Sequence, residues 1–144
     1  MKGLALDASV IIPALLAWHE HHEAALPVVQ RALAEPGGAL VPLPALLEAY
    51  AVMTRLPPPG RLRPQDAATL LRGTFAGRAR LAALSDEAGW ELLDSLSEAG
   101  IAGGATFDAH VLACARSAGA QALATFNRRD FERFGLRGIA LIRP

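Results

Sequence analysis

The sequence predicts an α/β fold with a mainly parallel central sheet and helices on both faces. Short apolar runs closed by turn or polar residues alternate along the chain with longer segments of helical periodicity. No internal repeat or low-complexity segment interrupts this alternation. The 144 residues are enough for one domain with its own hydrophobic core, so we expect a single domain over residues 1–144.

Five apolar runs predict the strands of this sheet. Each is short and bounded by Gly, Pro or polar residues, which is typical of a buried strand. They cover residues 3–6, 39–41, 80–84, 122–124 and 138–142.

Helical spacing of apolar residues predicts the helices between these strands. They cover residues 10–16, a segment running to Ala34, 44–53, 64–75, 85–100 and a segment that begins near Thr106. Thr106 is the expected N-cap of the last helix, and Ser9 or Asp7 is the expected N-cap of the first. The Pro-rich run 56–60 predicts an exposed connection.

Composition and charge exclude several protein classes. The 14 basic and 14 acidic residues balance, so there is no overall basic surface for nucleic acid. No apolar run approaches the ~20 residues of a membrane span, and the N-terminus resembles a strand rather than a signal peptide. Cys114 is the single cysteine and excludes an internal disulfide. We therefore expect a cytoplasmic protein that does not bind a membrane.

The tract Trp18–Glu23 contains three histidines but does not predict a metal site. His19, His21 and His22 lack the i, i+4 spacing that places two imidazoles on one helix face. A loop that leads into the second helix is the better interpretation.

Four carboxylates follow predicted strands or interrupt apolar helices, namely Asp7, Glu48, Asp108 and Asp130. Polar residues at the carboxyl ends of parallel strands are where α/β sheets bind ligands. Carboxylates that meet raise one another's pKa, and a hard cation removes this penalty. Oxygen ligands of this kind suit Mg²⁺ or Mn²⁺. Such ions support the hydrolysis of phosphodiesters.

Four motifs, in this order, resemble those of PIN-domain ribonucleases of the VapC toxin branch. They are Leu6-Asp7-Ala8-Ser9, Glu48 in an apolar helix, Phe107-Asp108-Ala109, and the stretch from Thr125 to Phe131 that reads TFNRRDF. Each motif alone is weak, but the order, the separations and the total length all fit, and the resemblance covers essentially the whole chain.

The resemblance implies a PIN-like α/β/α sandwich, Mg²⁺- or Mn²⁺-dependent endonucleolytic cleavage of RNA, a homodimer, and a cognate antitoxin protein. It implies that Asp7, Glu48 and Asp108 are catalytic metal ligands and that Asp130 or Asn127 completes the site. Ser9 and Thr125 would orient ligands or water. Arg128 and Arg129 would contact RNA phosphates, or would simply be solvated.

One departure from the pattern concerns Asn127, because many relatives have an acid there. An amide supplies an oxygen ligand without charge, so a second metal would depend on Asp130. This departure keeps open a second interpretation, a PIN-like scaffold without catalysis that only binds RNA or a protein partner.

Two other phosphate-handling α/β classes fit poorly. An aspartyl phosphatase of the haloacid dehalogenase type requires a second Asp two residues after the first, where this chain has Ser9. A response-regulator receiver requires a late Lys, and the only Lys is Lys2.

Overall fold

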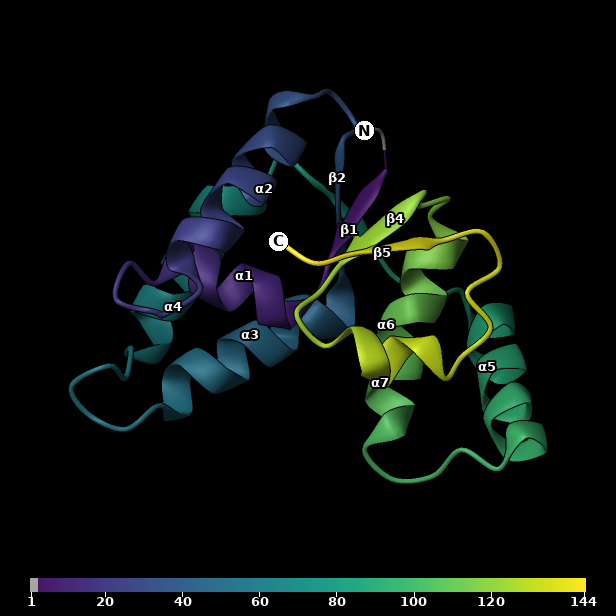
Figure 1. Ribbon diagram of the computed structural model, residues 1–144. Helices are drawn as coiled ribbons and strands as arrows, with labels where there is room; N and C mark the ends of the chain where they lie inside the picture. Colours follow the sequence, from purple (N-terminus) through teal and green to yellow (C-terminus); the bar gives the residue numbers. More distant parts are fainter. Residues whose placement is uncertain (1–2) are drawn as a thin grey trace.

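The computed structural model describes residues 3–144, in which five short strands form one parallel sheet (Figure 1). The strands are β1 Leu4–Leu6, β2 Ala39–Pro42, β3 Arg80–Ala82, β4 Ala122–Ala124 and β5 Ala140–Ile142. They lie in the order β3-β2-β1-β4-β5, and every pairing is parallel. The predicted parallel sheet is confirmed, although β3 ends earlier and β5 begins later than predicted.

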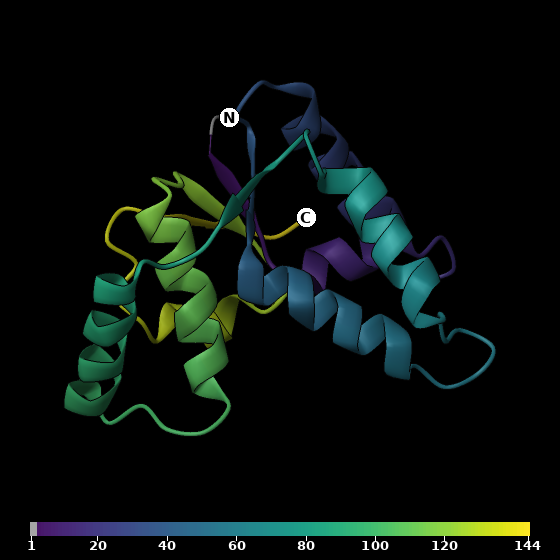
Figure 2. The ribbon, with the colours of Figure 1, turned by 180° about the vertical axis from the view of Figure 1, so that it is seen from behind.

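Helices cover both faces of the sheet, as predicted. They are α1 Ala8–Leu15, α2 His22–Ala34, α3 Leu43–Arg55, α4 Pro64–Phe75, α5 Asp86–Ala99, α6 Ala105–Ser117 and α7 Arg128–Glu132. In both views α1, α2 and α4 gather on one side of the sheet, and α5, α6 and α7 gather on the other (Figures 1 and 2). Helix α3 contacts both α1 and α6, so it joins the two groups below the ends of the strands.

The central strands are buried because their side chains are apolar on both faces. All residues of β1, β2 and β4 are buried, whereas the edge strands β3 and β5 are partly exposed. Side chains from the helices complete the core, and Ile11, Met53, Leu112 and Phe131 are among the largest that are fully buried. The three buried strands end close together, and this fixes the position of the residues that follow them.

Of the two caps predicted for α1, Asp7 is confirmed and Ser9 is wrong, and the cap predicted for α6, Thr106, is wrong. Helix α1 begins directly after Asp7, and the Ser9 hydroxyl bonds to the Asp7 carboxylate instead of capping the helix. Helix α6 begins at Ala105 with Gly104 as its cap, because the turn at Gly103, with a φ of 65°, starts the helix one residue before Thr106. The predicted start of α5 is confirmed, and the Ser85 side chain there accepts a bond from the Ala88 amide.

The sequence did not predict α7, because five residues are too short to display helical periodicity. This helix is anchored by Phe131, whose side chain is completely buried. Across residues 3–144, no helix has the length and apolar character needed to cross a membrane.

Candidate active site at the carboxyl ends of the central strands

Adjacent strands deliver the predicted acids to one edge of the sheet. Asp7 directly follows β1, and Glu48 lies in α3, which directly follows β2. Asp108 is in the first turn of α6, and Asp130 is in the first turn of α7, shortly after β4. Because β2, β1 and β4 are neighbours in a parallel sheet, their carboxyl ends lie side by side. The four acids therefore come from four different helices or their caps: Asp7 is the cap of α1, Glu48 lies in the second turn of α3, and Asp108 and Asp130 lie in the first turns of α6 and α7.

Asp7 is the buried centre of this region, with 4% of its surface exposed. Its Oδ2 accepts hydrogen bonds from Ser9 Oγ at 2.7 Å and from Thr125 Oγ1 at 2.8 Å. Burial raises the pKa of Asp7, and bonds from the two hydroxyls and from the Ala8 and Ser9 amides oppose this shift. The carboxylate is thus held rigidly on one side by neutral donors.

The same two hydroxyls fix the loop after β4. Ser9 Oγ accepts from the Phe126 amide at 3.0 Å, and Thr125 Oγ1 accepts from the Asn127 amide at 3.0 Å. The two hydroxyl oxygens are 3.2 Å apart. Ser9 and Thr125 therefore connect the end of β1 to the end of β4 and set where the chain turns toward Asp130.

Negative charges on neighbouring acids raise the pKa of two of the four acids, Glu48 and Asp108. The pKa of Glu48 is raised by desolvation and by the negative charges of Asp7 and Asp108. The pKa of Asp108 is raised by desolvation and by the charges of Asp7 and Asp130, against the opposing effect of Arg133. A cation among these groups would relieve the repulsion.

These shifts predict how the stability of the metal-free protein depends on pH. A carboxyl whose pKa is raised on folding binds more protons in the folded state than in the unfolded state. It therefore stabilises the folded protein most at pH values below its unfolded pKa. This stabilisation is lost as pH rises through its folded pKa. The unfolding free energy of wild-type protein in EDTA should therefore fall as pH rises from the ordinary Asp value of 3.8 toward neutrality.

Urea unfolding at a series of pH values measures this dependence. Asp7→Asn removes one buried charge and its repulsion of Glu48 and Asp108. The fall in unfolding free energy with rising pH should therefore be smaller in this variant than in wild type. Asp94→Asn is the control, because Asp94 is an exposed acid on α5. A fall of equal size in wild type and Asp7→Asn would show that these carboxylates do not repel one another in the folded protein.

Arg133 is a site residue that sequence reasoning missed. Its Nη2 lies 3.4 Å from Asp108 Oδ2, and its Nε donates to the Asp130 carbonyl at 2.9 Å. It thereby ties α6 to the residues just after α7. Arg133 follows Asp130 by three residues, and in a helix this spacing places two residues on the same face. The spacing could have indicated Arg133 only if α7 had been predicted as a helix.

The remaining predicted residues lie at the rim. Asn127 is the exposed cap residue of α7, and its predicted supporting role stays a prediction. Arg128 and Arg129 are exposed, and Arg128 lies 3.7 Å from Glu132. Their predicted contact with RNA stays a prediction as well.

The donor set fits a hard, hydrated cation. Within the described residues 3–144, no three Asp, Glu, His or Cys side chains lie close enough together to hold one ion directly. Mg²⁺ commonly takes only one or two carboxylates and keeps several of its waters. The oxygen-only character of the four acids, and the repulsion that raises the pKa values of Glu48 and Asp108, agree with that mode of binding.

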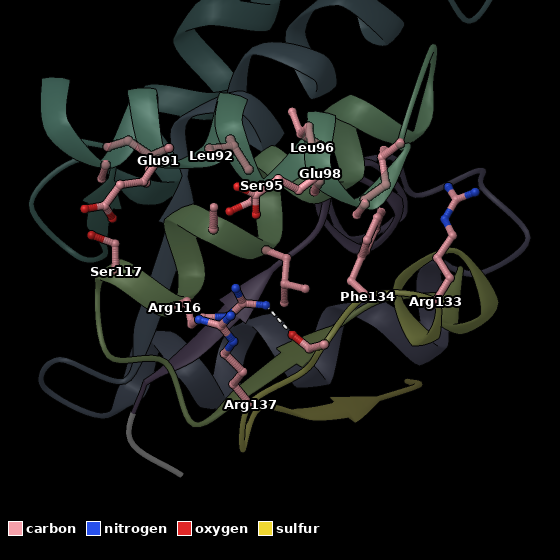
Figure 3. A pocket seen from close by; sticks show the side chains of 18 residues that line it. Glu91, Leu92, Ser95, Leu96, Glu98, Arg116, Ser117, Arg133, Phe134 and Arg137 are labelled. Carbon is pink, nitrogen blue, oxygen red and sulfur yellow. Dashed lines mark hydrogen bonds between the residues drawn. The ribbon is translucent and has the colours of Figure 1, made fainter.

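Two other features of the chain are separate from this site. His22 lies at the start of α2, where its Nδ1 is 2.8 Å from the Pro13 carbonyl, as a loop leading into a helix requires. A cavity of about 770 Å³ lies between α5, α6 and residues 133–137. Figure 3 shows Arg116 and Arg137 beside each other in it, with Arg116 bonded to the Gly135 carbonyl. None of the four acids lines this cavity, but Arg133, which contacts Asp108, does.

Comparison with known proteins places the chain in a family. The family model described as "PIN domain" matches residues 4–136. Ribonuclease VapC40 of Mycobacterium tuberculosis is 38% identical over 121 residues, which cover 83% of this chain and 84% of the relative. Ribonuclease VapC27 of the same organism is 36% identical over 140 residues, which cover 96% and 95%.

Solved structures agree with this fold. VapC20 of Mycobacterium tuberculosis, described as a sarcin–ricin loop cleaving toxin, aligns with a TM-score of 0.70 and 16% identity over 98% of this chain and 99% of that one. A chain of DNA-bound VapBC from Salmonella typhimurium aligns with a TM-score of 0.66 and 20% identity over 99% and 98%. The chain belongs to the PIN-domain family and is a homologue of the VapC ribonucleases.

Proposed function

We propose that this chain is a divalent-metal-dependent endoribonuclease and the toxin of a toxin–antitoxin pair. The observation that carries the proposal is that Asp7, Glu48, Asp108 and Asp130 lie around one edge of the sheet, where the charges of neighbouring acids raise the pKa values of Glu48 and Asp108. Relatives named as VapC ribonucleases support the same activity. We assign the activity to a single domain over residues 1–144 that acts in the cytoplasm.

Each residue has a distinct role in this proposal. Asp7, Glu48 and Asp108 would hold Mg²⁺ or Mn²⁺, and Asp130 would complete the set, with Asn127 as a neutral oxygen ligand nearby. When bound, such an ion polarises a phosphoryl oxygen and lowers the pKa of water for attack on phosphorus. Ser9 and Thr125 keep the Asp7 carboxylate in one orientation. Arg133, whose Nη2 is 3.4 Å from Asp108 Oδ2, would orient that carboxylate and would provide positive charge for a phosphate.

The proposed partners are RNA, a second copy of the chain and an antitoxin. An apolar groove of about 350 Å³ between α3, α4 and β3 supports a protein partner, because Leu47 and Leu81 beside it are both 57% exposed. Structures described as VapBC complexes have the same fold as this chain and contain a partner protein of that kind.

Metal removal tests the activity. Protein purified free of any antitoxin should cleave some member of a panel of labelled single-stranded and structured RNAs with Mg²⁺ or Mn²⁺, and it should cleave none in EDTA. Restoring the metal should restore cleavage. A protein that neither binds the metal nor cleaves RNA would instead be the catalytically inactive scaffold. Cleavage that persists undiminished in EDTA would contradict the assignment of the acids.

A further inference from the structure

A second hollow, of about 450 Å³, adjoins the acidic cluster. It is bounded by α1, α3, the loop between α1 and α2, and the loop after β4. Two of its lining residues, Ser9 and Asn127, also belong to the surroundings of Asp7. Val52 lines it from α3, four residues after Glu48, which is about 6 Å along the helix axis.

Aromatic side chains form the walls of this hollow. The His21 ring stacks on Phe126 with a centroid distance of 4.4 Å and an interplanar angle of 15°. The Phe126 amide donates to Ser9 Oγ, and Ser9 donates to Asp7, so this wall is connected by two hydrogen bonds to the buried acid. These two hydrogen bonds therefore fix the position of Phe126 relative to Asp7.

Trp18 also lines the hollow, and its side chain remains exposed to solvent. It is 61% exposed. One edge of its ring lies against Gly60, because a Cβ at Gly60 would approach within 3.1 Å of the ring. The Trp18 ring also lies beside His19, at a centroid distance of 6.0 Å. Because Trp18 is exposed and is not part of the core, its flat ring is available for stacking.

Arg143 adds positive charge to the same hollow. Its guanidinium lies 5.1 Å from the centre of the Phe126 ring, and Nη1 donates to the Phe126 carbonyl at 3.0 Å. Among residues 3–144, no carboxylate forms an ion pair with Arg143. The segment after β5, which is far in the sequence from α1, thus brings a cation without an ion-pair partner to the rim of the hollow. Figure 1 shows β5 leading toward α1.

We propose that this hollow binds an unstacked nucleobase of single-stranded RNA, at a nucleotide next to the cleaved phosphate. Proteins bind single-stranded RNA by stacking bases on aromatic rings and by placing Arg beside the backbone. The hollow combines both features, and its lining includes Ser9, which bonds to Asp7, and Val52, four residues after Glu48 on α3. A site for phosphate alone would not need Trp18 and the stacked pair, and a site for an apolar segment would not need Arg143. The inference rests on the proposed ribonuclease activity and names how the substrate base is held there.

Fluorescence of Trp18 tests base binding without requiring cleavage. The chain has two tryptophans, so Trp90→Phe leaves Trp18 as the only one, and Asp108→Asn in the same protein suppresses cleavage. A random-sequence single-stranded RNA oligonucleotide should quench Trp18 emission. An abasic oligonucleotide with the same number of phosphates should quench it at least tenfold less at equal concentration. Equal quenching by both, or none by either, would overturn the proposal.

Cleavage kinetics provide the second arm. Trp18→Ala should raise KM roughly tenfold, since base stacking on an aromatic ring is worth about that factor. It should also weaken the preference for the base next to the cleaved bond, and Trp18→Phe should restore most of both. Trp90→Ala is the matched control, because Trp90 is 69% exposed on α5 and lies outside the hollow.

The two arms separate the two possible failures. If wild-type protein cleaves no RNA but the base-dependent quenching occurs, the nuclease assignment fails and the base site stands. If wild type cleaves RNA and Trp18→Ala is unchanged in KM and in base preference, the base site is wrong and the nuclease stands. Quenching by a purified antitoxin but not by RNA would assign the hollow to the protein partner and would also overturn the proposal.

Discussion

Replacing Asp108 with Asn is expected to lower the single-turnover rate of RNA cleavage by about a thousandfold, equivalent to about 4 kcal/mol of transition-state stabilisation. The amide has the same size and still offers an oxygen to Arg133, but it lacks the negative charge that binds a hard cation. Asp108 suits this test better than the buried Asp7. Its side chain is 31% exposed, so the substitution does not disturb the core.

The measurement is cleavage of a labelled RNA with excess enzyme and saturating Mg²⁺, together with RNA affinity by fluorescence anisotropy. RNA affinity should change by only a few-fold, because Asp108 is proposed to bind metal and not RNA. Asp94→Asn on α5 is the matched control and should cleave at the wild-type rate. Cleavage by Asp108→Asn within a few-fold of wild type would remove Asp108 from the proposed metal site.

Phe131→Ala should reduce the free energy of unfolding by about 3–5 kcal/mol, the usual range when a fully buried Phe is truncated. Phe131 has no exposed surface and is the largest side chain that is fully buried. It holds the short helix α7 against the core, and this helix is too short to be stable by itself. Its loss should therefore also displace Asp130 and Arg133 and lower the cleavage rate.

Urea unfolding followed by circular dichroism measures the effect on stability. Phe107→Ala is the control for the same change of residue, because Phe107 is 68% exposed and its truncation should change stability by less than about 0.5 kcal/mol. Equal losses in the two variants would mean that α7 is not anchored through Phe131.

The sequence was a good guide to the sheet and to the order of the acids. Asp7 and Asp130 follow apolar runs, and Asp108 opens an apolar helix, so each position depends on local pattern and on the rule that ligands bind at the ends of parallel strands. The locations of these residues in the fold agree with that prediction. Their assignment as metal ligands stays a proposal.

Long-range contacts account for what the sequence could not predict. The hydrogen bond between Thr125 and Asp7 joins residues 118 positions apart, and local periodicity contains no information about it. Ser9 was predicted as a helix cap because local rules favour that role, but its hydroxyl is directed to Asp7 and to the loop after β4. Arg133 was missed for the same reason, since its partner Asp108 lies on a different helix.

The central position of β1 between β2 and β4 has a consequence for when activity can arise during synthesis. Asp7 is made 118 residues before Thr125, whose hydroxyl orients it, and the acid at position 130 is made later still. A nascent chain that has not reached β4 lacks both the strand that pairs with β1 and the hydroxyl that orients Asp7. We therefore expect cleavage to begin only after β4 and α7 have been made and have folded against β1.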